Sequence, residues 1–159
     1  MKRIVIGIEG SPDSMRAAEV GLELGRGLGA SVTFVCARIP PTPLLDVPFS
    51  QNDLEAEIAH AREVVGEAMS KAAAAAVTAD YEILDGAAAD AILRVAESHD
   101  ADLIVVGSRG LGTVQSAIFG SVSKELVTHA RRPVLVVKDS VGSEPQRDVP
   151  LVNDGAVLS

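Results

Sequence analysis

The sequence predicts an α/β fold, a single-domain open parallel sheet of five strands with helices on both faces. Short β-branched apolar runs alternate along the chain with longer segments of helical periodicity, the pattern of parallel α/β domains. Two runs, IVIGI at residues 4–8 and LIVVG at residues 103–107, contain no polar side chain and are typical of central strands. A length of 159 residues supports one domain, and an apolar fraction of 47% suffices for its core.

The first half of the chain supplies two strands and two helices. After strand 4–8, Gly10 and Pro12 predict a turn, and Ser11 or Asp13 can cap a helix over residues 15–28. Residues 31–39 read as the second strand, because β-branched and aromatic residues dominate them. One face of that strand should carry Val32, Phe34 and Cys36.

A proline-rich segment separates that strand from the longest helix. Four prolines within residues 40–49 exclude regular structure and predict a surface loop, which covers a ligand, docks on a partner or packs on its own domain. The helix should run from Asn52 or Asp53 to about residue 77. Its buried stripe is predicted to be Ile58, Ala61, Val65, Ala68, Met69 and Ala72.

The second half completes the sheet. Residues 78–84 alternate in polarity and predict an edge strand with Ala79, Tyr81 and Ile83 on one face. A helix over residues 88–99, the strand 103–107 and a helix over residues 121–130 follow. The fifth strand runs from Pro133 to Val137. No helix pattern follows it, so its apolar edge predicts self-pairing into a homodimer. Residues 139–159 read as a flexible tail, which leaves residues 1–138 as the domain.

Composition restricts the partners. A net charge of −8 disfavours nucleic acid and anionic membranes, because both attract basic surfaces. No apolar run approaches the roughly 20 residues of a membrane span. Cys36 is the single cysteine, so no intrachain disulfide is possible and a cytoplasmic location fits best.

The chemistry is concentrated directly after strand 103–107. Gly107, Gly110 and Gly112 precede a second cluster, Gly120-Ser121-Val122-Ser123, which opens the next helix. Glycines let backbone N–H groups approach a bulky anion, and a helix N-terminus offers unpaired donors with a favourable dipole. This stretch predicts a phosphate-binding loop, although glycines here could also serve only a turn and a helix cap.

The spacing of Gly107, two residues, Gly110, nine residues, Gly120-Ser121 resembles the ATP-binding signature of the universal stress protein family. The resemblance extends from about Lys2 to Lys138. It implies a Rossmann-like fold of the adenine nucleotide alpha hydrolase type with strand order 3-2-1-4-5. It also implies ATP, with Mg²⁺, as the ligand, a homodimer paired through the fifth strand, and a role in the stress response.

By this resemblance, the nucleotide lies where the strand order reverses, between the first and fourth strands. Glu9 stands where the family usually has Asp, Ala37 lies near the adenine, and Arg109 either pairs with a phosphate or is a solvated loop residue. The predicted nucleotide-binding residues are Glu9, Ala37, Gly107, Arg109, Gly110, Gly120, Ser121, Val122 and Ser123.

No catalytic residue or metal ligand is predicted, because the sequence lacks a Walker motif and its three histidines lie on different helices. At most slow ATP hydrolysis is expected. One alternative is a nucleotide-free dimeric interaction module of the same fold. Another is a phospho-accepting receiver domain, since Glu9, Asp85, Ser108 and Lys138 end predicted strands. An adenylating or ATP pyrophosphatase enzyme fits less well, because Glu9 to Ser14 only partly matches the loop it requires.

Overall fold

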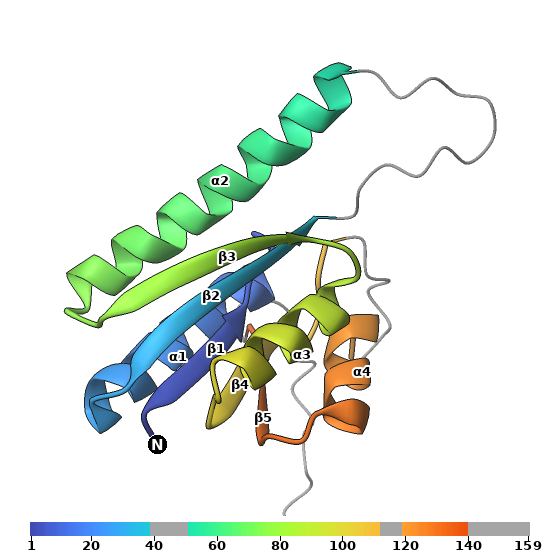
Figure 1. The fold of residues 1–159 in the computed structure, drawn as a ribbon. Coiled ribbons are helices and arrows are strands. Elements are labelled where there is room, and N and C mark those ends of the chain that lie inside the picture. The colour runs from blue at the N-terminus through green and yellow to red at the C-terminus, as the bar shows by residue number, and fades with distance from the viewer. Residues whose placement is uncertain (39–50, 112–118, 140–159) are drawn as a thin grey trace, which may run out of the picture.

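The computed structural model describes residues 1–38, 51–111 and 119–139. Its five strands form one parallel sheet of order 3-2-1-4-5, numbered along the chain, as the sequence predicts (Figure 1). The predicted proline-rich loop and Gly112 lie outside the described residues, as does the predicted tail apart from Asp139. The strands are β1 (Arg3–Gly7), β2 (Ser31–Arg38), β3 (Ala79–Asp85), β4 (Leu103–Gly107) and β5 (Val134–Val137). The helices are α1 (Pro12–Leu28), α2 (Gln51–Ala74), α3 (Ala88–Ser98) and α4 (Ser121–His129).

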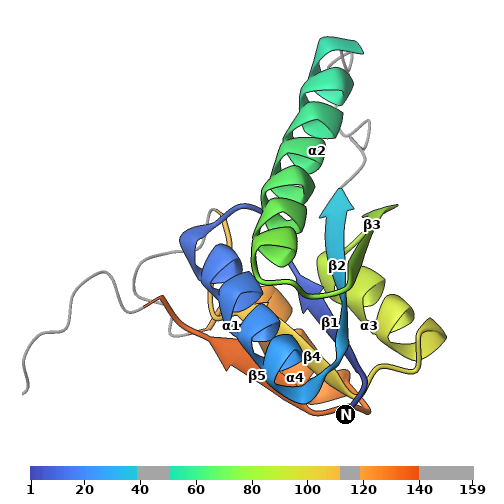
Figure 2. The ribbon, with the colours of Figure 1, turned by 90° about the vertical axis from the view of Figure 1, so that its left-hand side faces the viewer.

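Helices cover both faces of the sheet, with α1 and α2 on one side and α3 and α4 on the other (Figure 2). The alternation of side chains along each strand divides the core accordingly. On β1, Ile4 and Ile6 pack towards α1 and α2, whereas Val5 packs towards α3 and α4. Apart from the exposed Arg3, the two central strands are therefore buried on both faces, which explains why residues 4–8 and 103–107 contain no polar side chain.

The helix ends follow local rules. The hydroxyl of Ser11 accepts a hydrogen bond from the Ser14 N–H at 3.2 Å and caps α1, so Ser11 and not Asp13 is the cap. Gly29 ends α1 in the left-handed conformation at φ 63°. Helix α2 ends at Ala74, earlier than predicted, and Ala76 takes a positive φ of 54° in the turn that follows.

Two burial predictions were incomplete. Val64 belongs to the buried stripe of α2, whereas Ile58 and Met69 are only partly buried. The N-terminal half of α2 extends beyond the sheet, so its apolar side chains cannot be covered by strands (Figure 1). Tyr81 is 51% exposed although Ala79 and Ile83 on the same strand pack against the core. The edge position of β3 explains this exposure.

The strand order excludes the receiver-domain alternative. Receiver domains have the order 2-1-3-4-5, which places the third strand directly beside the first. Here β2 separates β3 from β1, so Asp85 at the end of β3 is not adjacent to Glu9. Asp85 instead forms an ion pair with Arg38 at the end of β2.

Candidate functional site

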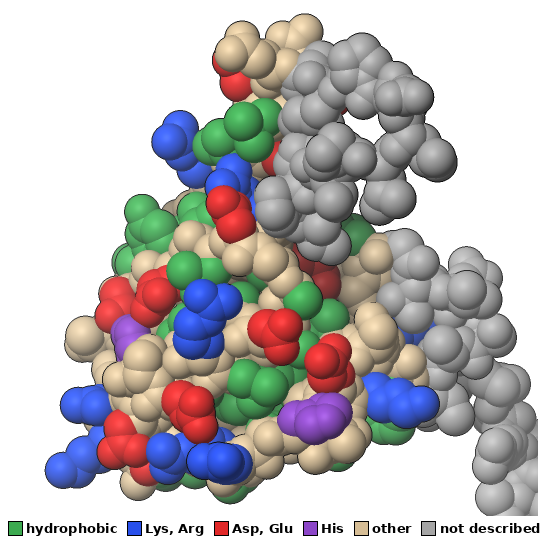
Figure 3. Space-filling view, turned by 45° about the vertical axis from the view of Figure 1, so that its right-hand side comes forward, with side chains coloured by type: hydrophobic (Ala, Val, Ile, Leu, Met, Phe, Trp, Pro, Cys, Tyr) green, Lys and Arg blue, Asp and Glu red, His purple; other side chains and the backbone are tan. Residues whose placement is uncertain are grey.

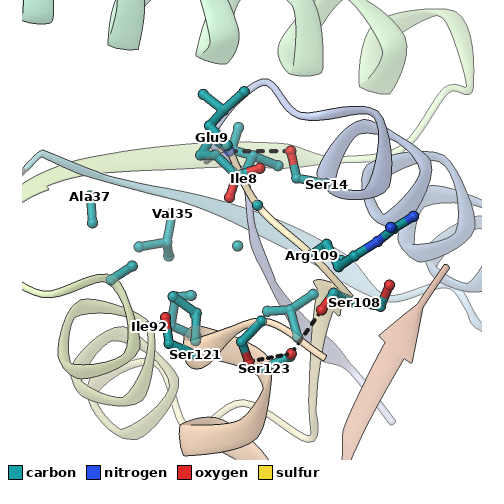
Figure 4. A pocket seen from close by; sticks show the side chains of 18 residues that line it. Ile8, Glu9, Ser14, Val35, Ala37, Ile92, Ser108, Arg109, Ser121 and Ser123 are labelled. Carbon is teal, nitrogen blue, oxygen red and sulfur yellow. Dashed lines mark hydrogen bonds between the residues drawn. The ribbon is translucent and has the colours of Figure 1, made fainter. Parts of the chain in front are cut away.

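A pocket opens at the carboxyl ends of β1 and β4, the two neighbouring strands between which the strand order reverses (Figure 4). Ligands of open α/β sheets bind at such reversal points. The pocket contains about 680 Å³ of empty space, including the part open to solvent. All nine residues predicted from the sequence line it: Glu9, Ala37, Gly107, Arg109, Gly110, Gly120, Ser121, Val122 and Ser123.

One wall of the pocket is apolar. Val35 and Ala37 from β2 face Ile92 of α3 across the space, and Val106 of β4 joins them (Figure 4). Val35 and Ala37 occupy the face of β2 opposite to Phe34 and Cys36, because side chains alternate along a strand. This wall can accept a flat, weakly polar ring such as a nucleobase.

The loop that carries Glu9 is held by Ser14. The Ser14 hydroxyl accepts hydrogen bonds from the N–H groups of Glu9 (3.3 Å) and Gly10 (3.2 Å), and donates one to the Ser11 carbonyl (3.1 Å). The Glu9 carboxylate accepts hydrogen bonds from the Ser11 N–H at 3.2 Å and from the Ser11 hydroxyl. Glu9 is therefore fixed at the pocket in one position, by its backbone and its side chain together.

Gly110 lies against this carboxylate. A Cβ atom on Gly110 would lie 2.6 Å from the Glu9 Oε2 atom, closer than side chains normally approach. The absence of a side chain at Gly110 is what allows the longer Glu9 side chain to fit beside the loop. The Glu9 carboxylate is thus in contact with the glycine loop.

Helix α4 points its N-terminus into the pocket. Gly120, its N-cap residue, provides no side-chain hydrogen bond, and by helix geometry the first N–H groups of α4 then have no acceptor within the described chain. The Gly120 N–H itself donates to the Ser108 carbonyl at 2.6 Å. The buried Ser123 hydroxyl is directed at the carbonyls of Ser108 and Gly120, both at 3.0 Å. At this described helix end, the donors left for an anion are the backbone N–H groups of residues 121–123 and the Ser121 hydroxyl.

Asp13 supports the site from outside the pocket lining, a role that sequence reasoning missed. Its side chain is buried, and its Oδ2 atom accepts hydrogen bonds from the Ser108 hydroxyl and from the Arg109 N–H at 3.0 Å. Its Oδ1 atom accepts one from the Asp139 N–H at 3.2 Å. Asp13 thereby joins the start of α1 to the ends of β4 and β5. An acid in the first turn of a helix was the available signal, but its partners lie about a hundred residues away.

Arg109 is oriented by the same carboxylate. Its Nε atom lies 3.8 Å from Asp13 Oδ2, and its side chain points towards α1, away from Val35 and Ala37 (Figure 4). Pairing of this guanidinium with a phosphate stays a prediction.

Gly107 allows the end of β4 to pack closely against the start of α1. A Cβ atom on Gly107 would lie 2.7 Å from the Asp13 carbonyl carbon and from the Ser14 nitrogen.

Two other titratable side chains, Cys36 and His60, lie near Glu9. Burial raises the pKa of the Cys36 thiol, and the negative charge of Glu9 raises it further. The Nε2 atom of His60, on α2, lies 3.2 Å from the Glu9 carbonyl oxygen.

Within the described ranges, no group of three or more His, Cys, Asp or Glu side chains could hold a metal ion. The described helices include none with the length and apolar character that a membrane span requires.

Known proteins with similar sequences cover most of this chain. A universal stress protein of Thermus aquaticus is 38% identical over 137 residues, covering 86% of this chain and 98% of the relative. A universal stress protein of Mycobacterium tuberculosis is 33% identical over 94% of this chain. The match covers only 52% of that relative's own length.

Solved structures extend the comparison. The universal stress protein UspA of Lactobacillus plantarum matches with a TM-score of 0.75 and 26% identity, over 86% of this chain and 97% of that one. A universal stress protein solved in complex with cAMP matches with a TM-score of 0.65 and 26% identity, over 86% of this chain and 96% of that one. The model of the universal stress protein family matches residues 1–138. The chain therefore belongs to the universal stress protein family.

Proposed function

We propose that this chain binds an adenine nucleotide, ATP with Mg²⁺ or a related mononucleotide, and couples its occupancy to a stress response. The observation that carries the proposal is the uncapped N-terminus of α4, which opens into an apolar-walled pocket at the reversal point of the sheet. The similar universal stress protein in complex with cAMP supports an adenine nucleotide as the class of ligand.

Each part of the pocket suits one part of such a ligand. The wall of Val35, Ala37 and Ile92 suits the adenine ring, and the Glu9 carboxylate can accept a hydrogen bond from a ribose hydroxyl. The N–H groups of residues 121–123 and the Ser121 hydroxyl suit phosphate oxygens. Mg²⁺ would neutralise phosphate charge, and it would be coordinated mostly by phosphate oxygens and water, as is usual for this ion.

Binding is proposed to matter more than turnover. The one carboxylate described as lining the pocket, Glu9, is already hydrogen-bonded to Ser11, which makes it a weak candidate for a general base. ATP hydrolysis is therefore proposed to be slow at most. The nucleotide-free interaction module is the alternative if no adenine nucleotide binds.

The proposal also covers the oligomeric state, the cellular location and the partners of the protein. The domain of residues 1–138 is proposed to form a cytoplasmic homodimer through β5, whose outer edge has no neighbouring strand in the described sheet. Nucleic acid and membranes are not proposed as partners. In support, acidic and basic side chains are interspersed over the face in Figure 3, without a broad basic surface.

Calorimetric titration with ATP and Mg²⁺, AMP and cAMP tests the proposal, with variants at the first residue of α4. Ser121→Pro removes one N–H donor, and the helix tolerates proline at this position because Gly120 is already extended at φ −74° and ψ 168°. We expect Ser121→Pro to weaken binding by roughly tenfold or more, since one charge-assisted hydrogen bond is lost. Ser121→Ala, which keeps the N–H, should weaken binding less. Equal affinities in both variants and the parent would contradict the assignment of phosphate to α4.

A further inference from the structure

The pocket has an unusual charge balance for a site proposed to hold a polyphosphate. Among the described residues that line it, only Glu9 and Arg109 carry a formal charge at neutral pH. The guanidinium of Arg109 lies beside the buried Asp13 carboxylate, which offsets its charge. The carboxylate of Glu9 lies on the glycine loop itself, against Gly110. The side chains at the site therefore contribute a net negative charge.

Two stretches between the described ranges contain no Lys or Arg in their sequence. Residues 112–118 connect Leu111 to Phe119 and contain no Lys or Arg. Residues 39–50 follow Arg38 and contain none either, while they include Asp46. Arg38 itself is paired with Asp85, and its position on β2 follows Ala37, so its side chain projects from the opposite face of the sheet.

The attraction for an anion comes instead from helix ends. The first turn of α4 contains no acidic residue, and its N-terminus carries roughly half a positive charge. The N-terminus of α3 also reaches the pocket through Ala88 and lacks a side-chain cap, but Asp90 in its first turn offsets that dipole. Such a site can hold one phosphate through N–H donors. Among the described residues, no further helix N-terminus without an acidic first turn reaches the pocket to hold a second or a third phosphate.

We infer that this site selects nucleotides by phosphate charge, and that Glu9 sets the selection: adenosine monophosphates, cyclic or linear, bind without metal, whereas ATP requires Mg²⁺. The inference rests on the proposed function and narrows it. Each added phosphate brings negative charge towards the Glu9 carboxylate, and the repulsion is strong in a partly desolvated pocket. Bound Mg²⁺ would reduce that repulsion by neutralising the additional phosphates.

The test measures dissociation constants for adenosine, cAMP, AMP, ADP and ATP, with EDTA and then with Mg²⁺, at low ionic strength so that charges are poorly screened. Three variants accompany the parent. Glu9→Gln removes the charge and keeps an oxygen that can accept from the Ser11 N–H. Glu9→Asp keeps the charge on a shorter side chain. Glu63→Gln, at an exposed position of α2, makes the same change in net charge away from the pocket.

In EDTA, the dissociation constant of the parent for ATP should be roughly tenfold or more above that for AMP. Mg²⁺ should narrow this ratio of dissociation constants. Glu9→Gln should narrow the AMP-to-ATP affinity ratio in EDTA as well. Glu9→Asp, which keeps the charge but withdraws it from Gly110, should narrow it less, and Glu63→Gln should leave it unchanged. The inference is overturned if ATP in EDTA binds as tightly as AMP, or if Glu9→Gln shifts every ligand equally. If all five ligands bind with similar dissociation constants, this inference is wrong but the proposed function stands. Failure of all five, uncharged adenosine included, removes the proposed function with it.

Discussion

The Asp13 carboxylate of α1 accepts a hydrogen bond at 3.0 Å from the backbone N–H of Arg109, in the loop after β4. The Ser108 hydroxyl donates to the same carboxylate, so two consecutive residues of the loop are attached to α1. Because the Ser108 carbonyl in turn accepts from the Gly120 N–H, the chain of contacts reaches the first residues of α4. One buried carboxylate therefore positions the two glycine clusters relative to each other.

Removing this carboxylate should lower stability and weaken ligand binding together. Asp13→Ala leaves the Ser108 hydroxyl and the Arg109 and Asp139 N–H groups without their acceptor, which should cost about 2–4 kcal/mol in the free energy of unfolding. Urea titration measures the loss. Asp80→Ala, at an exposed position on β3, is the control and should change stability by less than about 0.5 kcal/mol. Similar small losses in both variants would show that Asp13 does not hold the loop.

Two glycine-to-alanine changes should have opposite effects on stability. Gly107→Ala places a Cβ 2.7 Å from backbone atoms of Asp13 and Ser14, and backbone cannot move aside as a side chain can. We expect a loss of about 1–3 kcal/mol. Gly66→Ala, in the exposed middle of α2 with nothing within 4 Å, should gain about 0.5–1 kcal/mol from helix propensity. Thermal unfolding compares the two; a neutral Gly107→Ala would contradict the packing role of this glycine.

The sequence predicted most of the fold because apolar runs and helix-capping residues are local signals. The two apolar runs without polar residues became the adjacent central strands β1 and β4, and all nine candidate residues meet in one pocket. Element ends shifted by a few residues, as with α2, because caps and turns depend on backbone conformations such as that of Ala76.

What could not be predicted depends on contacts between distant parts of the chain. The sequence presents Asp13 only as a possible helix cap, because its partners Ser108 and Arg109 become neighbours only when α1 packs beside β4. The orientation of Arg109 depends on the same contact. Tyr81 follows the strand alternation correctly, yet alternation cannot tell how far a helix covers an edge strand.

Acid should weaken the attachment of the N-terminal strand. Hydrogen bonds from the backbone N–H of Lys2 (2.6 Å) and then of Arg3 (3.0 Å) lower the pKa of Asp102 below its ordinary value of 3.8. A lowered pKa in the folded state means that the carboxylate stabilises the fold above about pH 4, and that this contribution disappears as pH falls through the folded pKa. The parent should be more stable than Asp102→Asn at pH 7, and the difference should shrink towards pH 3 in urea titrations. A difference that is constant across this range would contradict the role of the charge.

The open edge of β5 should mediate dimer formation. Pro133 and Val137 accept hydrogen bonds from the β4 side through their carbonyls, so strand alternation places the N–H groups of Val134 and Val136 on the outer edge. Light scattering should give about twice the chain mass of 16.4 kDa for the parent. Val136→Pro removes an outer N–H and should yield monomers, whereas Val136→Ala, which keeps it, should remain dimeric. A monomeric parent would refute self-pairing through β5.

The measurement that bears most directly on nucleotide binding is a titration of Gly120→Asp beside the parent. A Cβ at Gly120 meets only ordinary contacts, the nearest at 3.5 Å, and φ is −74°, so the substitution is tolerated. Aspartate would cap α4 with its own carboxylate and occupy the phosphate position. Gly120→Asn, which caps without charge, is the matched control. We expect Gly120→Asp to melt at or above the parent temperature and to lose nucleotide binding, and Gly120→Asn to retain more of it. Undiminished binding in a folded Gly120→Asp protein would contradict the account.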